Sequence, residues 1–240
     1  MSNTGDNYID HYFDYGINTK DRIIYLGSIG NVDFEDDGDE AGITWNLARR
    51  FLKSLQILDS MSDKPIKVIM NSCGGSVTYG MAIYDAMEAS RSFITIINMS
   101  QASSMTSIIY QAGDARITAP NSHYMIHDGS FGFESTPGTV QAWLEFETKV
   151  SLPKMYEIYL NKIKAKDDEG NFVVDSDKAC DLLNSKLPSG SARISKTKGI
   201  RSLTVAHMKQ LCSRDCIFTA QEMVDLNLAD RLLKTGDLSE

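Results

Sequence analysis

No segment of this 240-residue chain approaches the roughly 20 consecutive apolar residues that a membrane-spanning helix requires. The first six residues are polar and contain neither the basic region nor the apolar region of a signal peptide. We therefore expect a cytoplasmic protein that does not bind membranes.

Cysteine is scarce. The four residues Cys73, Cys180, Cys212 and Cys216 are too few and too scattered for a disulfide scaffold. Cys212 and Cys216 could bind a metal ion together, but no second pair of Cys or His residues stands at a suitable spacing. We expect free thiols, no metal site and no cofactor.

Basic residues are outnumbered, because 24 Lys and Arg stand against 32 Asp and Glu and give a formal net charge of -8. This charge argues against a general affinity for nucleic acid or anionic membranes. With 42% hydrophobic and 23% charged residues, the chain has the composition of a soluble protein and enough length for one core. We expect a polar tail over residues 1–12 and a single domain over residues 13–240.

Short β-branched runs alternate along the chain with stretches whose apolar residues recur at helical spacing. Strands are expected at residues 22–26, 66–70, 93–97, 115–118, 123–127, 216–218 and 229–233, and helices at 44–62, 78–89, 108–112, 139–164, 205–211 and 220–226. The alternation predicts an α/β fold built from parallel β-α-β units. In such sheets ligands bind beyond the carboxyl ends of the strands.

Two stretches resemble insertions. Residues 33–40 form an acidic run that mimics the start of a calcium-binding loop, but Thr44 stands where the bidentate Glu would be. Residues 166–202 are rich in turn-forming and charged residues, and the basic part over residues 186–201 is expected to be a surface loop.

Ser104 is the first candidate for a nucleophile. It lies in a run of small residues, 98–107, between a strand-like stretch and a helix-like one, where the chain must turn sharply. Serine at such a position is ordinarily a helix cap that satisfies backbone amides. Catalysis becomes the better interpretation only if a base, an orienting acid and an oxyanion site occur elsewhere.

The search for a base is short, because the chain has only four histidines. His11 lies in the polar tail and His207 on a helical pattern. His123 and His127 flank an apolar strand, and a separation of four residues places both on one strand face. Spacing alone does not choose between them.

Gly74 and Gly75 follow a predicted strand directly. Without a Cβ, glycine lets backbone amides approach a ligand closely, although an ordinary strand-to-helix turn has the same sequence. Together with the amide that follows Ser104, this loop would supply the two donors that an oxyanion hole needs.

Several motifs occur in one order and together resemble the ClpP family, the proteolytic subunits of ATP-dependent Clp serine proteases. They are Asn-Ser-Cys-Gly-Gly at residues 71–75, Gly-Met-Ala-Ile-Tyr-Asp at 80–85, Gln-Ala-Ser-Ser-Met at 101–105 and Pro-Asn-Ser-His-Tyr-Met-Ile-His at 120–127. The similarity extends over about residues 13–233, interrupted by the two insertions.

The resemblance implies a crotonase-like spiral of β-β-α units and a catalytic triad. The family's nucleophile corresponds to Ser104, its base to His127 and its acid to Asp215, whereas His123 falls where the family usually carries arginine. The chemistry agrees, since Ser104 would attack a carbonyl, His127 would carry its proton and Asp215 would orient the imidazole. The family's oxyanion amides fall on Gly75 and Met105.

The family also binds its substrate as an extended strand between two backbone segments, a mode that reads backbone more than side chains. The corresponding residues here are Gly74, Gly75, Ser76, Val77 and Thr78 on one side and Gly129, Ser130, Phe131 and Gly132 on the other. A protruding handle over about residues 129–164 would join two stacked heptameric rings into a tetradecamer.

The chain departs from the family pattern in several places. Cys73 replaces the usual proline, Asp128-Gly129 replaces Gln-Pro, and the Gly-Gln-Ala motif near the handle is missing. The strand before Asn71 also lacks the aromatic residues that partly line the family's docking pocket for unfoldase loops. The resemblance therefore implies peptidase chemistry more strongly than partnership with an AAA+ unfoldase.

The leading hypothesis is a serine endopeptidase that hydrolyses unfolded proteins or peptides inside an oligomeric ring. A ring or scaffold subunit that assembles without cleaving is a second hypothesis. A crotonase-type acyl-CoA enzyme is a third, but it would leave the occurrence of Ser104, His127 and Asp215 together unexplained. A relative of the signal-peptide peptidases is a less suitable interpretation, because those enzymes use a lysine base and a membrane anchor, and this sequence shows no anchor.

Overall fold

The computed structural model describes residues 7–27, 42–132, 134–166, 172–174, 176–195 and 202–238. The expected acidic loop at 33–40 lies outside these residues, as do residues 1–6 of the tail and parts of the second insertion. The chain divides into two compact units. The first comprises residues 1–125, 218–224 and 229–240, and the second comprises residues 126–217 and 225–228.

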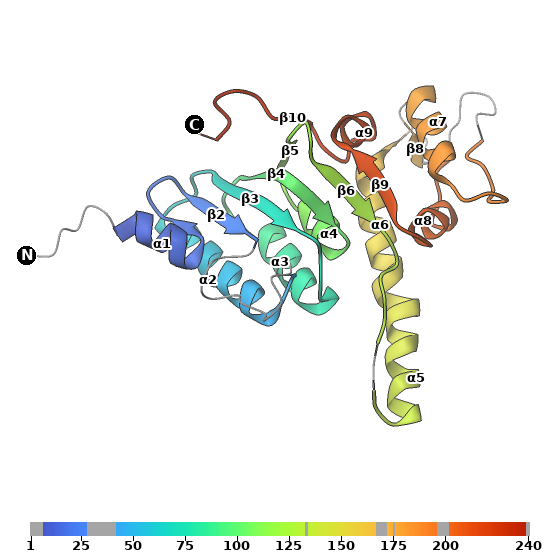
Figure 1. The fold of residues 1–240 in the computed structure, drawn as a ribbon, viewed down its shortest axis with the longest axis horizontal. Coiled ribbons are helices and arrows are strands. Elements are labelled where there is room, and N and C mark those ends of the chain that lie inside the picture. The colour runs from blue at the N-terminus through green and yellow to red at the C-terminus, as the bar shows by residue number, and fades with distance from the viewer. Residues whose placement is uncertain are drawn as a thin grey trace, which may run out of the picture. The chain divides into compact units, whose positions relative to one another are not determined.

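The first unit is built on a parallel sheet, as the sequence predicts (Figure 1). Its strands lie in the order β1-β2-β3-β4-β5-β10, and all neighbouring pairs are parallel except β1 with β2. The bounds are β1 Ile17–Asn18, β2 Ile23–Leu26, β3 Ile66–Ser72, β4 Ile94–Ser103, β5 Ala115–Thr118 and β10 Arg231–Leu232. A mixed α/β protein with a central sheet is therefore confirmed.

Three helices accompany these strands: α2 (Trp45–Met61), α3 (Val77–Glu88) and α4 (Met105–Tyr110). The apolar positions of α2 recur at helical spacing and are buried, including Phe51, Leu55 and Leu58. The first residues, Asn7–Tyr15, form helix α1, so the expected polar tail is helical from residue 7 onward.

Strand β4 is longer than the sequence predicts and is shared by two neighbours. Its residues Thr95 to Asn98 pair with β5, and Gln101 to Ser103 pair with β6 (His123–Ile126). The run of small residues that we expected to begin a turn at residue 98 therefore continues as a β-strand as far as residue 103. The buried Asn98 permits this extension, because its side-chain amide donates to the His123 carbonyl (3.1 Å). Strand β6 also pairs with β9 (Cys216–Thr219), and helix α9 (Ala220–Asp225) follows β9.

The second unit contains the long helix expected at 139–164. It begins at Pro137 and consists of α5 (Pro137–Phe146), a π-helical turn (Glu147–Ser151) and α6 (Leu152–Ile163). Helix α6 buries Met155, Tyr156, Tyr159, Leu160 and Ile163, whereas α5 buries none of its residues. The two halves of one helix therefore differ in their surroundings.

The second insertion is more ordered than the sequence suggests. The antiparallel pair of β7 (Lys164–Lys166) and β8 (Phe172–Val174) spans its start, α7 (Asp177–Lys186) lies within it, and α8 (Val205–Cys212) comes after it. The surface loop expected from 186 is fixed as far as Ile194, which is buried and bonded through both of its backbone groups to the Asn184 side chain. Ser176 as a cap and the apolar residues 179, 180 and 183 were the signal for α7.

Within the described residues no helix has the length and apolar character needed to cross a membrane.

Candidate active site

Ser104 lies between the last residue of β4 and the first residue of α4, with φ 53° and ψ -126°. A residue with a Cβ rarely adopts a positive φ, and the cost is about 1–3 kcal/mol. The backbone is held there by the Ser104 amide, which donates to the Met125 carbonyl (2.8 Å), and by the Ser104 carbonyl, which accepts from the Ser107 amide (2.9 Å).

The cap interpretation of Ser104 fails on a comparison within the same chain. Thr44, Ser76 and Ser176 precede helices with extended backbones, and each side chain accepts a hydrogen bond from an amide of the first helical turn. Ser104 makes no such capping bond to α4, and its backbone is not extended. The ordinary role of serine at this position, as a side-chain cap, is therefore not the one that Ser104 has here.

Gly74 lies against this serine, and Gly75 lies against Ile43, two residues before α2. Their φ values are 108° and 141°. A Cβ on Gly74 would lie 2.5 Å from Ser104 Cβ and 3.1 Å from the Met105 amide nitrogen, and one on Gly75 would lie 2.5 Å from the Ile43 nitrogen. Both positions therefore require glycine, for conformation and for space.

Two backbone amides of this region lie outside the hydrogen bonds that the structure shows for the bridge to Ile43 and for α4. Ile43 bridges the loop through its own amide, which donates to the Gly74 carbonyl (2.6 Å), and its carbonyl, which accepts from the Ser76 amide (2.9 Å). The Gly75 amide is not part of that bridge. Met105 opens α4, and the first amides of a helix have no acceptor within the helix.

The second unit brings His127 and Asp215 together, although 88 residues separate them. His127 Nδ1 lies 3.0 Å from Asp215 Oδ1, and the side chains are 25% and 66% exposed. His123 is exposed at the start of β6, in register with Gln101. Of the two histidines that spacing left open, His127 is therefore the one that contacts a carboxylate.

A second pair of contacts flanks His127, and the sequence did not indicate it. The Asp128 carboxylate accepts from the Tyr156 hydroxyl of α6 (2.5 Å), and the Asp128 amide donates to the Cys212 carbonyl at the end of α8 (2.7 Å). Burial, followed by the hydrogen bond to Asp128 and then by the charge of that carboxylate, raises the pKa of Tyr156 well above its ordinary value. The only available signal was Asp128 itself, which departs from the family motif.

The predicted substrate-binding residues occupy two kinds of backbone. Ser76 caps α3, and Val77 and Thr78 lie in its first turn. Gly129 to Gly132 have no regular secondary structure, Gly129 has φ 79°, and Phe131 is 46% exposed.

All four cysteines are in the described residues, and none forms a disulfide; Cys73 is exposed and the other three are buried. In the part of the chain that the structure describes, no group of three or more His, Cys, Asp or Glu side chains is placed to hold a metal ion.

A family model described as Clp protease matches residues 40–169, more than half of the chain. The chain belongs to the Clp protease family. The matched range contains Gly75, Ser104, Met105 and His127, while Asp215 lies beyond it. The assignment of Asp215 therefore depends on its contact with His127.

Curated relatives agree with the family. The chain is 35% identical over 122 residues to an ATP-dependent Clp protease proteolytic subunit of Deinococcus radiodurans, which covers 49% of this chain and 53% of that protein. It is 33% identical over 127 residues to ATP-dependent Clp protease proteolytic subunit 3 of Streptomyces avermitilis, covering 52% of each. The matches thus span about half the length of these relatives.

Proposed function

We propose that this protein is a serine endopeptidase of the Clp type, with Ser104 as nucleophile, His127 as base and Asp215 as orienting acid. The observation that carries the proposal is the 3.0 Å contact between His127 Nδ1 and Asp215 Oδ1. A carboxylate on Nδ1 fixes the tautomer in which Nε2 accepts a proton. The assignment of Ser104 as nucleophile is supported by its positive φ and by the fact that its side chain does not cap α4.

In the proposed reaction, Ser104 Oγ attacks the scissile carbonyl while His127 Nε2 takes the hydroxyl proton. The imidazolium, stabilised by Asp215, then returns the proton to the leaving amine, and water hydrolyses the acyl-enzyme by the same route. The Gly75 and Met105 amides would donate to the oxyanion. The chain itself favours the pairing of Ser104 with His127, because the Ser104 amide bonds to Met125, two residues before that histidine.

The wider proposal follows the family. The substrate would be an unfolded polypeptide that lies as a strand between residues 74–76 and 129–132, because Val77 and Thr78 already belong to the first turn of α3. Residues 13–240 would form one crotonase-like domain of β-β-α units, and the handle over 129–164 would join heptameric rings into a closed chamber in the cytoplasm, without a cofactor. The exposed apolar side chains of α5 support such a contact. An AAA+ unfoldase partner has weaker support, since β3 carries no aromatic residue.

A fluorophosphonate probe tests the chemistry directly. We expect the native protein to be labelled, the Ser104→Ala variant to be unlabelled, and the Ser60→Ala variant, which changes an exposed serine on α2, to be labelled like the native protein. Absence of labelling on the native protein, or labelling that persists in the Ser104→Ala variant, would contradict the proposal.

Peptide cleavage distinguishes the endopeptidase from a scaffold subunit. Assembled native protein should hydrolyse casein and short fluorogenic peptides, and Ser104→Ala should assemble equally well without cleaving either. A native assembly that cleaves neither substrate would favour the scaffold.

A further inference from the structure

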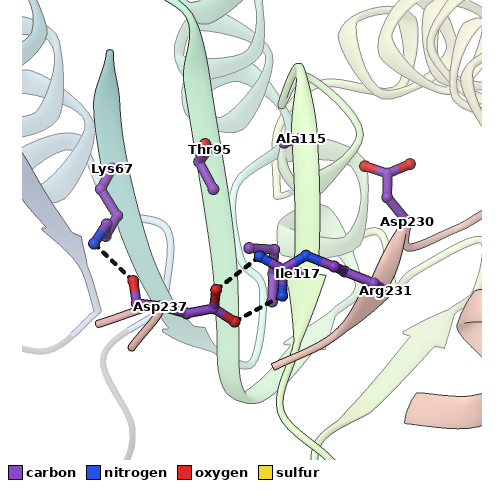
Figure 2. A pocket seen from close by; sticks show the side chains of 7 residues that line it. All are labelled: Lys67, Thr95, Ala115, Ile117, Asp230, Arg231 and Asp237. Carbon is purple, nitrogen blue, oxygen red and sulfur yellow. Dashed lines mark hydrogen bonds and ion pairs between the residues drawn. The ribbon is translucent and has the colours of Figure 1, made fainter. Parts of the chain in front are cut away.

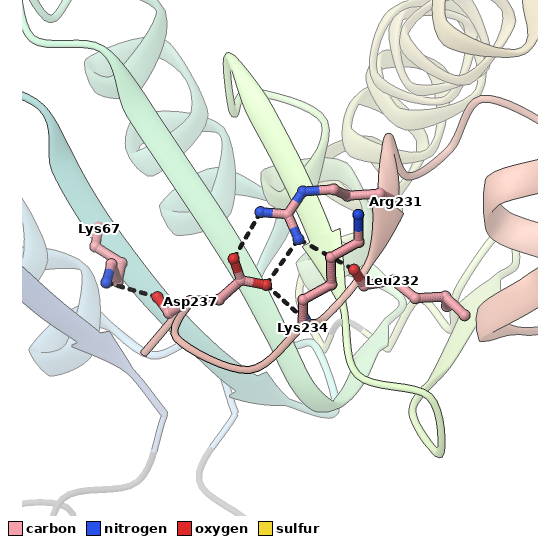
Figure 3. A network of polar contacts seen from close by, with 5 residues as sticks. All are labelled: Lys67, Arg231, Leu232, Lys234 and Asp237. Atoms are coloured by element: carbon pink, nitrogen blue, oxygen red, sulfur yellow. Dashed lines mark hydrogen bonds and ion pairs between the residues drawn. The ribbon is translucent and has the colours of Figure 1, made fainter. Parts of the chain in front are cut away.

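The two ends of the strands in the first unit have different surroundings. At the amino ends, the first or second residues of β3, β4 and β5 (Lys67, Thr95 and Ala115) line a cavity of about 260 Å3 (Figure 2). Arg231 and Asp237, which also line it, form an ion pair with each other (Figure 3). At the carboxyl ends, where parallel sheets bind their ligands, the chain instead presents a pair of aromatic side chains.

Trp45 and Tyr79 form this pair at the beginnings of two helices. Ile43 is bridged to Gly75, and Trp45 begins α2 two residues after Ile43. Ser76 accepts a hydrogen bond from the Tyr79 amide, which places Tyr79 in the first turn of α3. The ring centroids of Trp45 and Tyr79 are 5.7 Å apart. The chain on both sides of the glycine loop therefore leads directly to an aromatic ring.

The aromatic pair is open to solvent and has uncharged surroundings. Trp45 is 57% exposed, and Tyr79 is half-buried. The exposed residues next to them in sequence, Asn46 and Thr78, carry no charge. Tryptophan and tyrosine offer large, rigid apolar faces and are enriched where proteins bind other chains. Such a surface suits an apolar side chain better than a charged one.

The first turn of α3 also contacts the residues around the proposed nucleophile. A Cβ on Gly80, the residue after Tyr79, would lie 2.8 Å from Met105 Cε. Only four residues separate Tyr79 from Gly75, so their Cα atoms are at most about 14 Å apart. An extended substrate advances about 3.3 Å per residue. A substrate side chain a few residues from the scissile bond therefore reaches the aromatic pair.

We propose that Trp45 and Tyr79 form a specificity subsite that binds an apolar or aromatic side chain of the substrate, about two to four residues from the scissile bond. The subsite rests on the proposed peptidase function and adds a side-chain preference to a site that otherwise reads backbone. Contact with the rings removes apolar surface from water in the bound substrate and in the transition state alike. The preference should therefore appear in KM rather than in kcat.

Cleavage products reveal such a preference directly. We expect mass spectrometry of denatured casein, digested by the assembled native protein, to show aromatic and large apolar residues enriched at one position two to four residues from the cleaved bonds. Two internally quenched peptides that differ only in Phe or Ser at that position then measure its size. The native protein should favour the Phe peptide about tenfold in kcat/KM, and Trp45→Ala should lose this preference.

Three comparisons separate the subsite from a general defect. Trp45→Phe retains an aromatic ring and should retain the preference. Phe93→Ala removes a similarly exposed aromatic side chain (52%) that precedes β4, at the opposite end of the strands, and should behave like the native protein. Trp45→Ala should still be labelled by the fluorophosphonate probe, which reacts at Ser104. If Trp45→Ala does not fold by circular dichroism, Trp45→Gln takes its place.

The outcomes distinguish the subsite from the peptidase chemistry. A native protein that is labelled and cleaves casein without a positional preference would overturn the subsite alone, as would a preference that persists in Trp45→Ala or is lost equally in Phe93→Ala. A native protein that is neither labelled nor able to cleave would overturn the proposed function and the subsite with it.

Discussion

Gly74 follows the end of β3 and Ser104 follows the end of β4, and the two residues are packed closely against each other. The glycine lies so close that a single added carbon would stand 2.5 Å from Ser104 Cβ and 2.7 Å from the Ser103 carbonyl. The serine in turn holds a backbone conformation that its own Cβ disfavours. The loop therefore holds a strained residue in place by surrounding it closely, which is the arrangement expected of a preorganised nucleophile.

The Gly74→Ala variant tests this arrangement. The new methyl group must displace Ser104 and must also adopt a φ of 108°, so we expect a loss of about 2 kcal/mol in the free energy of unfolding and at least a tenfold loss of fluorophosphonate labelling. Urea denaturation and labelling rates measure the two effects.

Gly138→Ala is the matched control for that variant. Gly138 lies in α5, nothing stands within 4 Å of an added Cβ, and alanine favours a helix by up to about 1 kcal/mol. We expect unchanged labelling in this variant. If both glycine variants lost labelling equally, the close fit at Gly74 would not be the cause.

At the scale of elements, the contacts of Asp128 tie three segments together. Its carboxylate reaches α6 through Tyr156, and its amide reaches the end of α8 through Cys212, three residues before Asp215. The residues on either side of the His127–Asp215 contact are thus held by neighbouring hydrogen bonds. We assign Tyr156 a positioning role, since its hydroxyl bonds to Asp128 rather than to the histidine.

Tyr156→Phe removes the hydroxyl and leaves the buried ring. We expect kcat for peptide cleavage to fall about tenfold with little change in KM, because the variant misplaces the base without touching the substrate. Because the pKa of Tyr156 is raised, its hydroxyl stays protonated from acidic to mildly alkaline pH, and the deficit should be constant over that range.

Tyr159→Phe is the control for this variant, since it changes another buried tyrosine of α6. A loss of equal size in both variants, or a loss confined to KM, would contradict the positioning role of Tyr156.

The ion pair between Arg231 and Asp237 near the C-terminus should make the stability of the protein depend on pH. Arg231, then the Lys234 amide, lowers the pKa of Asp237 from 3.8 to about 2. Because the folded value lies below the unfolded one, the stabilisation is complete above about pH 4–5 and is lost as the pH falls toward 2. Asp237→Asn should therefore lower the melting temperature at neutral pH, and its difference from the native protein should shrink below pH 4. A difference that is the same at pH 7 and at the lowest accessible pH would contradict the assignment.

The sequence predicts most elements because their signals are local. The strand at 66–70 and the helix at 44–62 follow from local patterns. Asn227 follows the helix predicted at 220–226 and has φ 56°, the left-handed conformation in which Asn commonly replaces Gly after a helix. Strand β4 was predicted too short, because the pairing that extends it through Gln101 to Ser103 comes from β6, which a local pattern does not contain.

The candidate site was predictable only in part. Ser104, Gly75 and His127 stand in ordered motifs, and the choice of His127 over His123 came from the family resemblance rather than from spacing. The contacts of Asp215 and of Tyr156 join residues 88 and 28 positions apart, and no pattern in the chain encodes such distances. These contacts become visible only when the chain is folded.

At the scale of the whole molecule, the family and the surface of α5 lead to one expectation about assembly. Trp143 and Phe146 are 45% and 48% exposed and form an edge-to-face pair with centroids 5.9 Å apart. If α5 joins two heptameric rings as proposed, the side chains of Trp143 and Phe146 are buried in the contact between those rings.

Trp143→Asp should therefore halve the particle mass measured by light scattering, while each subunit remains folded. Gln141→Asp, which adds the same charge at an exposed polar position about 200° around the helix from Trp143, should leave the mass unchanged. A native particle no larger than one ring, or equal masses for both variants, would contradict the role of α5.

The π-helical turn at Glu147–Ser151 determines where that pair of aromatic rings points. A π turn accommodates one more residue than an α-helix does, and each residue rotates a helix by about 100°. The extra residue in the turn therefore rotates the side chains of α5 about the helix axis relative to the buried face of α6. Removing one residue there would keep a continuous helix, yet would swing Trp143 about a quarter of a turn around the axis.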